Sequence, residues 1–251
     1  AKLLLSFLSG ARAEDRQSLV TLAVSLAQLG LDTHDLVSES GGRETLGQAR
    51  SRQMKVLAGD YFNGRFYQLL AQADRIDIVR FVSSAICEVN RLKMSMYEKF
   101  RQLKLTAEEY LDQMVMIRSE LFLSFRNVIP PLHADHYPEL LLGMARCEVI
   151  SEEIERNRAG ELHYGWAYWH MLHIAAPDDK EKMLQGDSAG VGLLMHKYKI
   201  HSLLSNMLQA QIGASHRLID QFDSDVLRSE LIRMLEPFKL RIAVPKVAEE
   251  I

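Results

Sequence analysis

Hydrophobic residues recur at intervals of three and four along nearly the whole chain, which is the period of amphipathic α-helices. No segment shows the sustained alternation rich in Val, Ile and Thr that is typical of strands. The pattern predicts an all-α fold of about nine or ten helices. Since no fixed-period repeat and no low-complexity linker interrupts it, we expect a single all-helical domain over residues 1–251.

Two predicted helices in the first half of the chain are much longer than the mean of about 11 to 12 residues. The first covers residues 44–73 and has an apolar face formed by Met54, Leu57, Ala58, Tyr61, Phe62, Leu69 and Leu70. The second covers residues 76–104 and has an apolar, buried side formed by Ile78, Val82, Ala85, Ile86, Val89, Leu92 and Met96.

Turn and cap residues predict the limits of the other helices. Thr106 followed by Glu109 forms a capping box, and the helix that it starts ends before Pro130. We expect a break at Pro237 in the last helix. The remaining helices are predicted over 13–29, 138–157, 163–174, 187–222 and as far as about 235.

Composition and charge narrow the classes of function. The 251 residues carry a net charge of −3, and no run of Lys or Arg forms the stripe of a nucleic-acid-binding protein. Cys87 and Cys147 lie in helical patterns without a CxxC or Cys/His spacing, so we expect small buried thiols in a reducing, cytoplasmic compartment. The apolar run near the start is too short for a signal peptide or a transmembrane segment.

The segment VLAGDYFNGRFYQLL, residues 56–70, resembles the segment that follows the first Asp-rich cluster of trans-polyprenyl diphosphate synthases. Those enzymes hold Mg²⁺ on two clusters of Asp, because two diphosphate groups must be brought together and one of them ionised. The expected place of the first cluster holds LDTHDLVSESGG instead. Asp32, Asp35 and Glu39 are its nearest candidates, and acids of this kind usually solvate turns or cap helices.

The second Asp-rich cluster is equally absent from the late helix where we expect it. The segment LLSNMLQAQIGASHRLIDQF contains Asp220 as its one acid before Asp223. Asp178, Asp179 and Glu181 are the adjacent acids that stand out, and we interpret them as first-turn residues stabilised by the helix dipole.

Two further sets of side chains could in principle hold a metal. Glu148, Ser151 and Glu155 have the i, i+3, i+7 spacing of the terpene-cyclase metal motif, although a solvated helix face is the interpretation we favour. The other set is histidines that share a face near Trp166, Tyr168 and Trp169, for which we favour packed or interface aromatics: His163, His170 and His173.

Three runs together resemble the small, noncatalytic component of heptaprenyl or hexaprenyl diphosphate synthase. They are GDYFNGRFYQLLA from Gly59, EVNRLKMSMYEKF from Glu88 and TAEEYLDQMVMIRSELFLSF from Thr106. The resemblance implies an isoprenoid-synthase-type helical bundle without the Asp-rich motifs. It also implies a heterodimer in which a larger catalytic subunit holds the Mg²⁺, this chain binds no cofactor and influences product length, and the pathway is menaquinone side-chain synthesis.

The same resemblance marks a candidate partner-facing or channel-supporting surface, with internal core as the alternative for each residue. For Asp60 and Arg65 we expect a structural ion pair or cap, and we assign no catalytic residue in this chain. The candidate surface consists of Gly59, Asp60, Tyr61, Phe62, Arg65, Phe66, Tyr67, Phe81, Met94 and Met96.

Two other functions stay open at this point. The chain could be a self-sufficient Mg²⁺-dependent prenyltransferase or terpene cyclase that uses Glu148, Ser151 and Glu155 with Asp32 or Asp35. It could also be a helical adaptor unrelated to isoprenoids. Self-pairing of the isolated chain is compatible with each of these functions.

Overall fold

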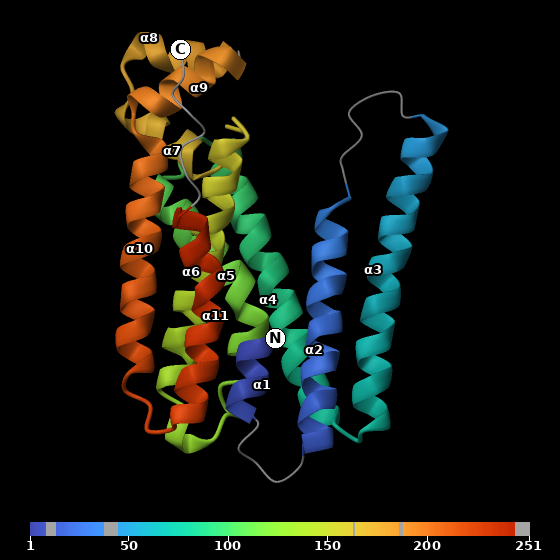
Figure 1. Cartoon of the computed structure of the whole chain (residues 1–251). Helices are drawn as coiled ribbons and strands as arrows, with labels where there is room; N and C mark the ends of the chain where they lie inside the picture. Colours follow the sequence, from blue (N-terminus) through green and yellow to red (C-terminus); the bar gives the residue numbers. More distant parts are fainter. Residues whose placement is uncertain (9–13, 38–44, 163, 186–187, 244–251) are drawn as a thin grey trace. The chain divides into compact units, whose positions relative to one another are not determined.

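The computed structural model describes residues 1–8, 14–37, 45–162, 164–185 and 188–243. These residues form eleven α-helices and one 3₁₀ helix, with no strand among them (Figure 1). The all-α prediction is confirmed. The chain divides into two compact units, which we call unit 1 (Ala1–Asn90 and Glu120–Tyr137) and unit 2 (Arg91–Ser119 and Pro138–Ile251). The prediction of a single domain stays a prediction.

Unit 1 contains the first three helices and parts of the next three. Its core includes Phe7, which packs edge-on against Tyr137 with ring centroids 5.2 Å apart. The Tyr137 hydroxyl donates a hydrogen bond of 3.0 Å to the Phe122 carbonyl, so this buried phenol is satisfied. The helices that begin in unit 1 are α1 (Lys2–Leu8), α2 (Glu14–Asp35), α3 (Leu46–Gln72) and α4 (Ile76–Arg101).

Helices α2 and α3 pack side by side as an antiparallel pair (Figure 1). Helix α3 starts with a capping box in which the Thr45 hydroxyl accepts from the Gln48 N–H, and the Gln48 side chain accepts from the Thr45 N–H. The long helix predicted over 44–73 is therefore confirmed. Its apolar residues Met54, Leu57 and Tyr61 nevertheless lie exposed, while Phe66 and Leu70 are buried.

Unit 2 has a large core whose buried residues lie between Leu105 and Ile212. Helices α10 and α11 pack against each other, and both contribute apolar residues to this core (Figure 1). The helices of unit 2, in addition to the end of α4, are α5 (Ala107–Leu123), α6 (His136–Arg158), α7 (Trp166–Ile174), α8 (Pro177–Gln185), α9 (Ser188–Lys197), α10 (Ile200–Ile219) and α11 (Asp225–Ala243). The first residues of α6 and the last of α5 belong to unit 1, where the short 3₁₀ helix Pro131–His133 precedes α6.

The capping box predicted at the start of α5 is present. The Glu109 N–H donates to the Thr106 hydroxyl at 3.1 Å, and the Thr106 N–H donates to the Glu109 carboxylate at 3.0 Å. The hydrogen bond from the Thr106 backbone lowers the pKa of Glu109. The sequence rule therefore located this helix start to within one residue.

Three predicted helix limits were wrong. Helix α2 continues to Asp35, beyond the predicted end at residue 29, because Leu31 is still buried in unit 1. Residues 188–219 form two helices because Lys199 adopts a left-handed conformation (φ 53°) that ends α9 before α10 begins. Helix α11 continues through Pro237 to Ala243, since Phe238 and Ile242 pack against the core of unit 2. Pro237 and Arg233 are both exposed, so water can hydrate the carbonyl that lacks its usual N–H donor.

The two cysteines occupy opposite environments. Cys147 is completely buried in the core of unit 2, as predicted. Cys87 is exposed, so the prediction of a buried thiol was wrong there. The reason is its position on α4, where it lies on the side opposite the buried Ala85 and Val89.

No helix in the described part of the chain combines the length and apolar character needed to span a bilayer.

Candidate functional site

Two glycines allow α2 and α3 to approach closely within unit 1. A Cβ atom at Gly59 would lie 2.6 Å from Nε2 of His34, and one at Gly30 would lie 2.6 Å from Oδ1 of Asn63. Neither distance is compatible with a real side-chain carbon, so a larger residue at either position would require His34 or Asn63 to move. The glycine of the Gly59–Asp60 motif thus serves helix packing.

The polar residues of this motif make local contacts. Oδ1 of Asp60 lies 3.4 Å from Nε2 of His34, which is the geometry of a structural ion pair when the imidazole is protonated. Arg65 donates from Nη1 to Oε1 of Gln68 at 2.6 Å. Both contacts lie on the surface of unit 1, where such pairs contribute little to stability.

The structure divides the candidate surface into buried and exposed residues. Phe66 is completely buried, with its ring centroid 4.1 Å from that of Tyr67, whereas Tyr61 is exposed. The Tyr67 hydroxyl lies 3.0 Å from the Ser83 hydroxyl. In unit 1, Phe62 and Phe81 are half-buried. In unit 2, Met94 is exposed and Met96 packs against the core.

Of the acids near the expected first metal cluster, the structure describes Asp32 and Asp35, and these two do not form a metal site. Oδ1 of Asp32 accepts a hydrogen bond of 2.8 Å from Nε2 of Gln28, one turn earlier on α2. Asp35 is the last residue of α2, and Glu39 lies outside the described residues. Among the described residues no group of three or more His, Cys, Asp or Glu side chains is arranged to hold a metal ion.

Arginines occupy the acidic face of α6. The Arg118 guanidinium from α5 lies 2.5 Å from Glu152 and 3.8 Å from Glu148. Glu155 accepts from Arg158 at 3.0 Å and from Arg241 of α11 at 2.8 Å. A divalent cation at these carboxylates would have to displace guanidinium groups that are already in contact with them.

The third member of the proposed motif is also engaged. The Ser151 hydroxyl is buried and donates a hydrogen bond of 2.7 Å to the Cys147 carbonyl, one turn back along α6. Burial raises the pKa of Glu152 even though Arg118 opposes this effect. The i, i+3, i+7 spacing of Glu148, Ser151 and Glu155 therefore supports packing between helices of unit 2 in this structure.

The adjacent acids of α8 also make specific contacts. Oδ2 of Asp179 accepts from Nζ of Lys197 at 2.5 Å and from the Tyr198 hydroxyl at 2.7 Å. The Tyr198 hydroxyl oxygen in turn accepts from the Ala176 N–H at 3.1 Å. The Lys197 and Tyr198 hydrogen bonds lower the pKa of Asp179. Asp179 lies in the first turn of α8, as expected, and also ties α8 to the end of α9.

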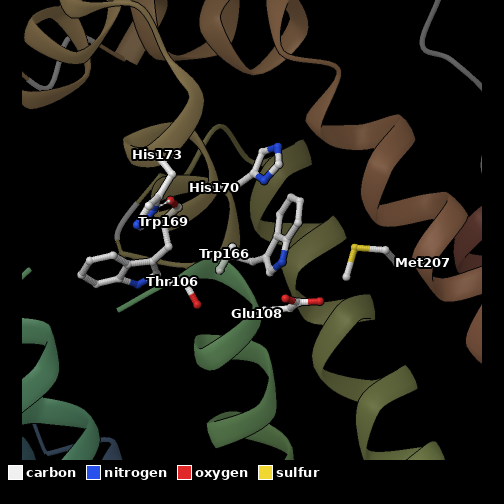
Figure 2. Close-up of a pocket in the computed structure, with 8 residues that line it drawn as sticks. Thr106, Glu108, Trp166, Trp169, His170, His173 and Met207 are labelled. Carbon is white, nitrogen blue, oxygen red and sulfur yellow. Dashed lines mark hydrogen bonds between the residues drawn. The ribbon is translucent and has the colours of Figure 1, made fainter. Parts of the chain in front are cut away.

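The aromatic segment lines an open hollow of about 420 Å³ in unit 2 (Figure 2). The Trp166 and His170 rings stack with centroids 4.6 Å apart, and Nδ1 of His173 lies 2.8 Å from the Trp169 carbonyl. Burial lowers the pKa of His170, which favours the neutral form of its ring. The hollow is lined by Thr106, Ala107, Glu108, Trp166, Trp169, His170, His173 and Met207.

Packing is the main role of this segment. Trp166, Tyr168 and Trp169 are buried, which confirms the expectation of packed aromatics for these three residues. His163 lies outside the described residues. Glu108, His170 and His173 line the hollow, but among the described residues these three side chains are not arranged to hold a metal ion.

The sequence analysis did not identify one buried acid that is important for unit 2. Glu153 is 4% exposed and accepts hydrogen bonds from the Tyr110 hydroxyl at 2.8 Å and from the Trp166 N–H at 2.7 Å. It therefore joins α5, α6 and the start of α7. The signal was its spacing of four and three residues from Val149 and Ile150, which places a carboxylate on the buried face of α6.

Comparison with known proteins decides the family. A family model described as heptaprenyl diphosphate synthase (HEPPP synthase) subunit 1 matches residues 1–220. The chain belongs to this family. Heptaprenyl diphosphate synthase component 1 of Geobacillus stearothermophilus is 40% identical over 78 residues, which cover 31% of this chain and 33% of that relative. These matches confirm the resemblance to the small synthase component that the three runs indicated.

Solved structures share the fold. A decaprenyl diphosphate synthase from Rhodobacter capsulatus superposes with a TM-score of 0.77 at 14% identity, covering 97% of this chain and 84% of that chain. A geranylgeranyl pyrophosphate synthetase from Pyrococcus horikoshii Ot3 gives a TM-score of 0.75 at 14% identity, covering 97% of this chain and 85% of that chain. The subunit 1 family member described here thus has the all-α fold of polyprenyl synthases.

Proposed function

We propose that this chain is the noncatalytic subunit of a heterodimeric trans-polyprenyl diphosphate synthase of heptaprenyl or hexaprenyl type. Its partner is a larger catalytic subunit that carries the Mg²⁺ and condenses isopentenyl diphosphate onto an allylic diphosphate. The small subunit is required for activity, takes part in control of product length and serves menaquinone side-chain synthesis in the cytoplasm. Membership of the subunit 1 family supports a partner subunit.

The observation that carries the noncatalytic role is the pairing of the acids on α6. Glu152 and Glu155 each contact arginine at 3.0 Å or less, and Glu148 lies 3.8 Å from Arg118. Ionisation of an allylic diphosphate in this fold depends on Mg²⁺ ions held by carboxylates. Carboxylates that already neutralise arginine are poor ligands for that purpose, so the proposal places the metal in the partner.

An exposed apolar stripe on α3 supports a protein partner for unit 1. Met54, Leu57 and Tyr61 are 64%, 61% and 63% exposed and lie on one face at spacings of three and four. A continuous apolar stripe on a long helix is usually buried in a core or in an interface. We therefore place part of the partner-facing or channel-supporting surface here, with Tyr67 at its margin.

The test is an assay of this chain alone, the large subunit of the same organism alone, and the mixture. Incorporation of labelled isopentenyl diphosphate is measured with Mg²⁺ and an allylic primer. We expect long-chain product from the mixture and none from either subunit alone. Product made by this chain alone would instead support a self-sufficient enzyme, and full activity of the large subunit alone would contradict a required small subunit.

A double variant tests whether the acids of α6 take part in the chemical reaction. Glu148→Gln combined with Glu155→Gln should leave the turnover of the mixture within about twofold of the natural value, because these side chains make surface ion pairs. A loss of turnover by a factor of about 1,000 in a complex that still assembles would assign them to catalysis and sink the proposal.

A further inference from the structure

The end of α4 and the turn after it carry a strong excess of positive charge. Residues 91–104, all in unit 2, include five bases and one acid, which gives a net charge of +4 in a chain whose net charge is −3. The bases are Arg91, Lys93, Lys99, Arg101 and Lys104, and the acid is Glu98. Bases in the last turn also complement the helix dipole, but Arg91 lies more than two turns before the helix end and is beyond that effect.

Exposed apolar side chains alternate with these bases on one face of the helix. Met94 and Tyr97 are 59% and 48% exposed, and their spacing places them on the same side of α4 as Arg91 and Arg101. The Arg101 guanidinium lies 6.0 Å from the centroid of the Tyr97 ring. Met, Tyr and Arg are the residue types enriched at protein interfaces, whereas Lys and Glu are depleted there.

Leu103, in the turn after α4, has an unusual backbone conformation for a leucine. It adopts a left-handed conformation with φ 52° at the position where helices usually end with Gly. The Leu103 N–H donates to the Phe100 carbonyl and the Lys104 N–H to the Lys99 carbonyl, which is the Schellman pattern. The Leu103 side chain is 54% exposed, so its burial does not offset the strain of this backbone conformation.

We propose that these residues form a docking surface for an acidic face of the larger synthase subunit, a statement that rests on the proposed function. We call it the α4 basic face and define it as Arg91, Met94, Tyr97, Arg101, Leu103 and Lys104. The bases supply charge complementarity and steering, and Met94, Tyr97 and Leu103 supply the apolar contact. Leu103 then gains in the complex the burial that it lacks in the free chain.

The charge part of the proposal is tested by binding to the purified large subunit at two salt concentrations. Arg101→Glu combined with Lys104→Glu should weaken the Kd by about tenfold or more, because it sets like charges against an acidic face. The Kd of the natural chain should also rise between about 50 and 200 mM salt, and the charge-reversed variant should lose much of that dependence. Arg233→Glu on α11 is the matched control, since Arg233 is another exposed helical arginine of unit 2.

The apolar part has a test that cannot fail through misfolding. Leu103→Gly removes the side chain and relieves the left-handed strain, so its Tm should equal or exceed that of the natural chain. Its affinity for the large subunit should nevertheless fall by about fivefold or more if Leu103 is an interface contact. Leu240→Ser on α11 is the matched control, because Leu240 is an exposed leucine of unit 2.

The outcomes separate this inference from the proposed function. If the natural subunits form an active complex and all the α4 variants bind as tightly as the natural chain, the α4 basic face is wrong and the proposed function stands. If no complex and no joint activity are found, both fail. A third outcome is that the variants leave the complex with the large subunit unchanged but abolish self-association or binding to phosphatidylglycerol vesicles. In that case the α4 basic face binds a second copy of this chain or a lipid surface, and the proposed docking surface is wrong.

Discussion

His34 of α2 and Gly59 of α3 face each other so closely that position 59 has no space for a methyl group. The three nearest atoms to a Cβ at this position are all in the His34 ring, at 2.6, 2.7 and 2.8 Å. The imidazole also contacts Asp60 at 3.4 Å, so both residues of the family motif meet the same histidine. The motif therefore sets the distance between two helices of unit 1.

Replacing this glycine should destabilise the chain. Gly59→Ala should lower the free energy of unfolding by about 1 to 3 kcal/mol, because the His34 ring and the helix backbone must move apart. Urea unfolding followed by circular dichroism measures the effect. Gly64→Ala is the control on the same helix, and since a Cβ there meets nothing within 4 Å it should stabilise by about 0.5 to 1 kcal/mol. Equal effects of the two variants would contradict the close contact.

The buried carboxylate of Glu153 should be important for the stability of unit 2. Glu153→Leu leaves the Tyr110 hydroxyl and the Trp166 N–H without their acceptor and should cost about 3 kcal/mol. The near-ultraviolet circular dichroism of the tryptophans should change as well. Glu161→Gln, at an exposed position, should stay within about 0.5 kcal/mol. A Leu variant as stable as the natural chain would show that these bonds are not needed.

Removal of Arg118 should make stability depend more strongly on pH. Burial already raises the pKa of Glu152, and without Arg118 this pKa should rise further above its unfolded value. A carboxyl with a raised native pKa binds its proton in the folded state, so stability falls as pH rises through that pKa. Arg118→Met should therefore lose about 1 kcal/mol at pH 7 and less at pH 4.5, a value reduced for the partial exposure of the pair.

A second substitution checks the cause. Adding Glu152→Gln to Arg118→Met removes the carboxyl that titrates, so the extra dependence on pH should disappear. Unfolding curves at several pH values measure this. If the pH dependence persists in the double variant, another group is responsible.

The two thiols should react very differently. Burial raises the pKa of the Cys147 thiol to about 12, whereas Cys87 is exposed on α4. A thiol reagent at pH 8 should modify Cys87 in the native chain and Cys147 only after unfolding. In the native chain the Cys147 thiol keeps its proton, whereas the unfolded chain releases this proton above a pH of about 9. The free energy of unfolding should therefore fall as pH rises from about 9 towards 12. Rapid modification in a Cys87→Ser variant would contradict this burial.

Local rules predicted much of the fold because they depend on neighbouring residues. The Thr106–Glu109 box and the apolar period of α4 were read correctly, since caps and helix faces are set within a few residues. The helix end at Lys199 and the continuation of α11 through Pro237 were not predicted. No sequence motif marks a lysine with left-handed backbone, and a proline inside a helix depends on packing with distant residues.

The candidate site was harder to predict because its contacts join residues that are far apart in the sequence. The acids of α6 were recognised, but their partners come from α5 and α11, and the contact between Arg241 and Glu155 joins residues far apart in the sequence. Hydrophobic spacing also could not tell that the Met54 and Tyr61 face of α3 is exposed. Which face of a helix meets another helix is decided by the tertiary arrangement.

The arginines of α5 and α11 that contact the acids of α6 also determine how this chain should respond to chelating agents. A guanidinium is covalently part of the protein and keeps its charge at any pH the fold tolerates, so EDTA cannot extract it and dialysis cannot dilute it. Removal of the metal from an acidic metal site leaves carboxylates that repel one another. The contacts with Arg118 and Arg241 do not depend on a metal, so EDTA should leave these carboxylates in place. We therefore expect treatment with EDTA to leave the circular dichroism of the folded chain unchanged.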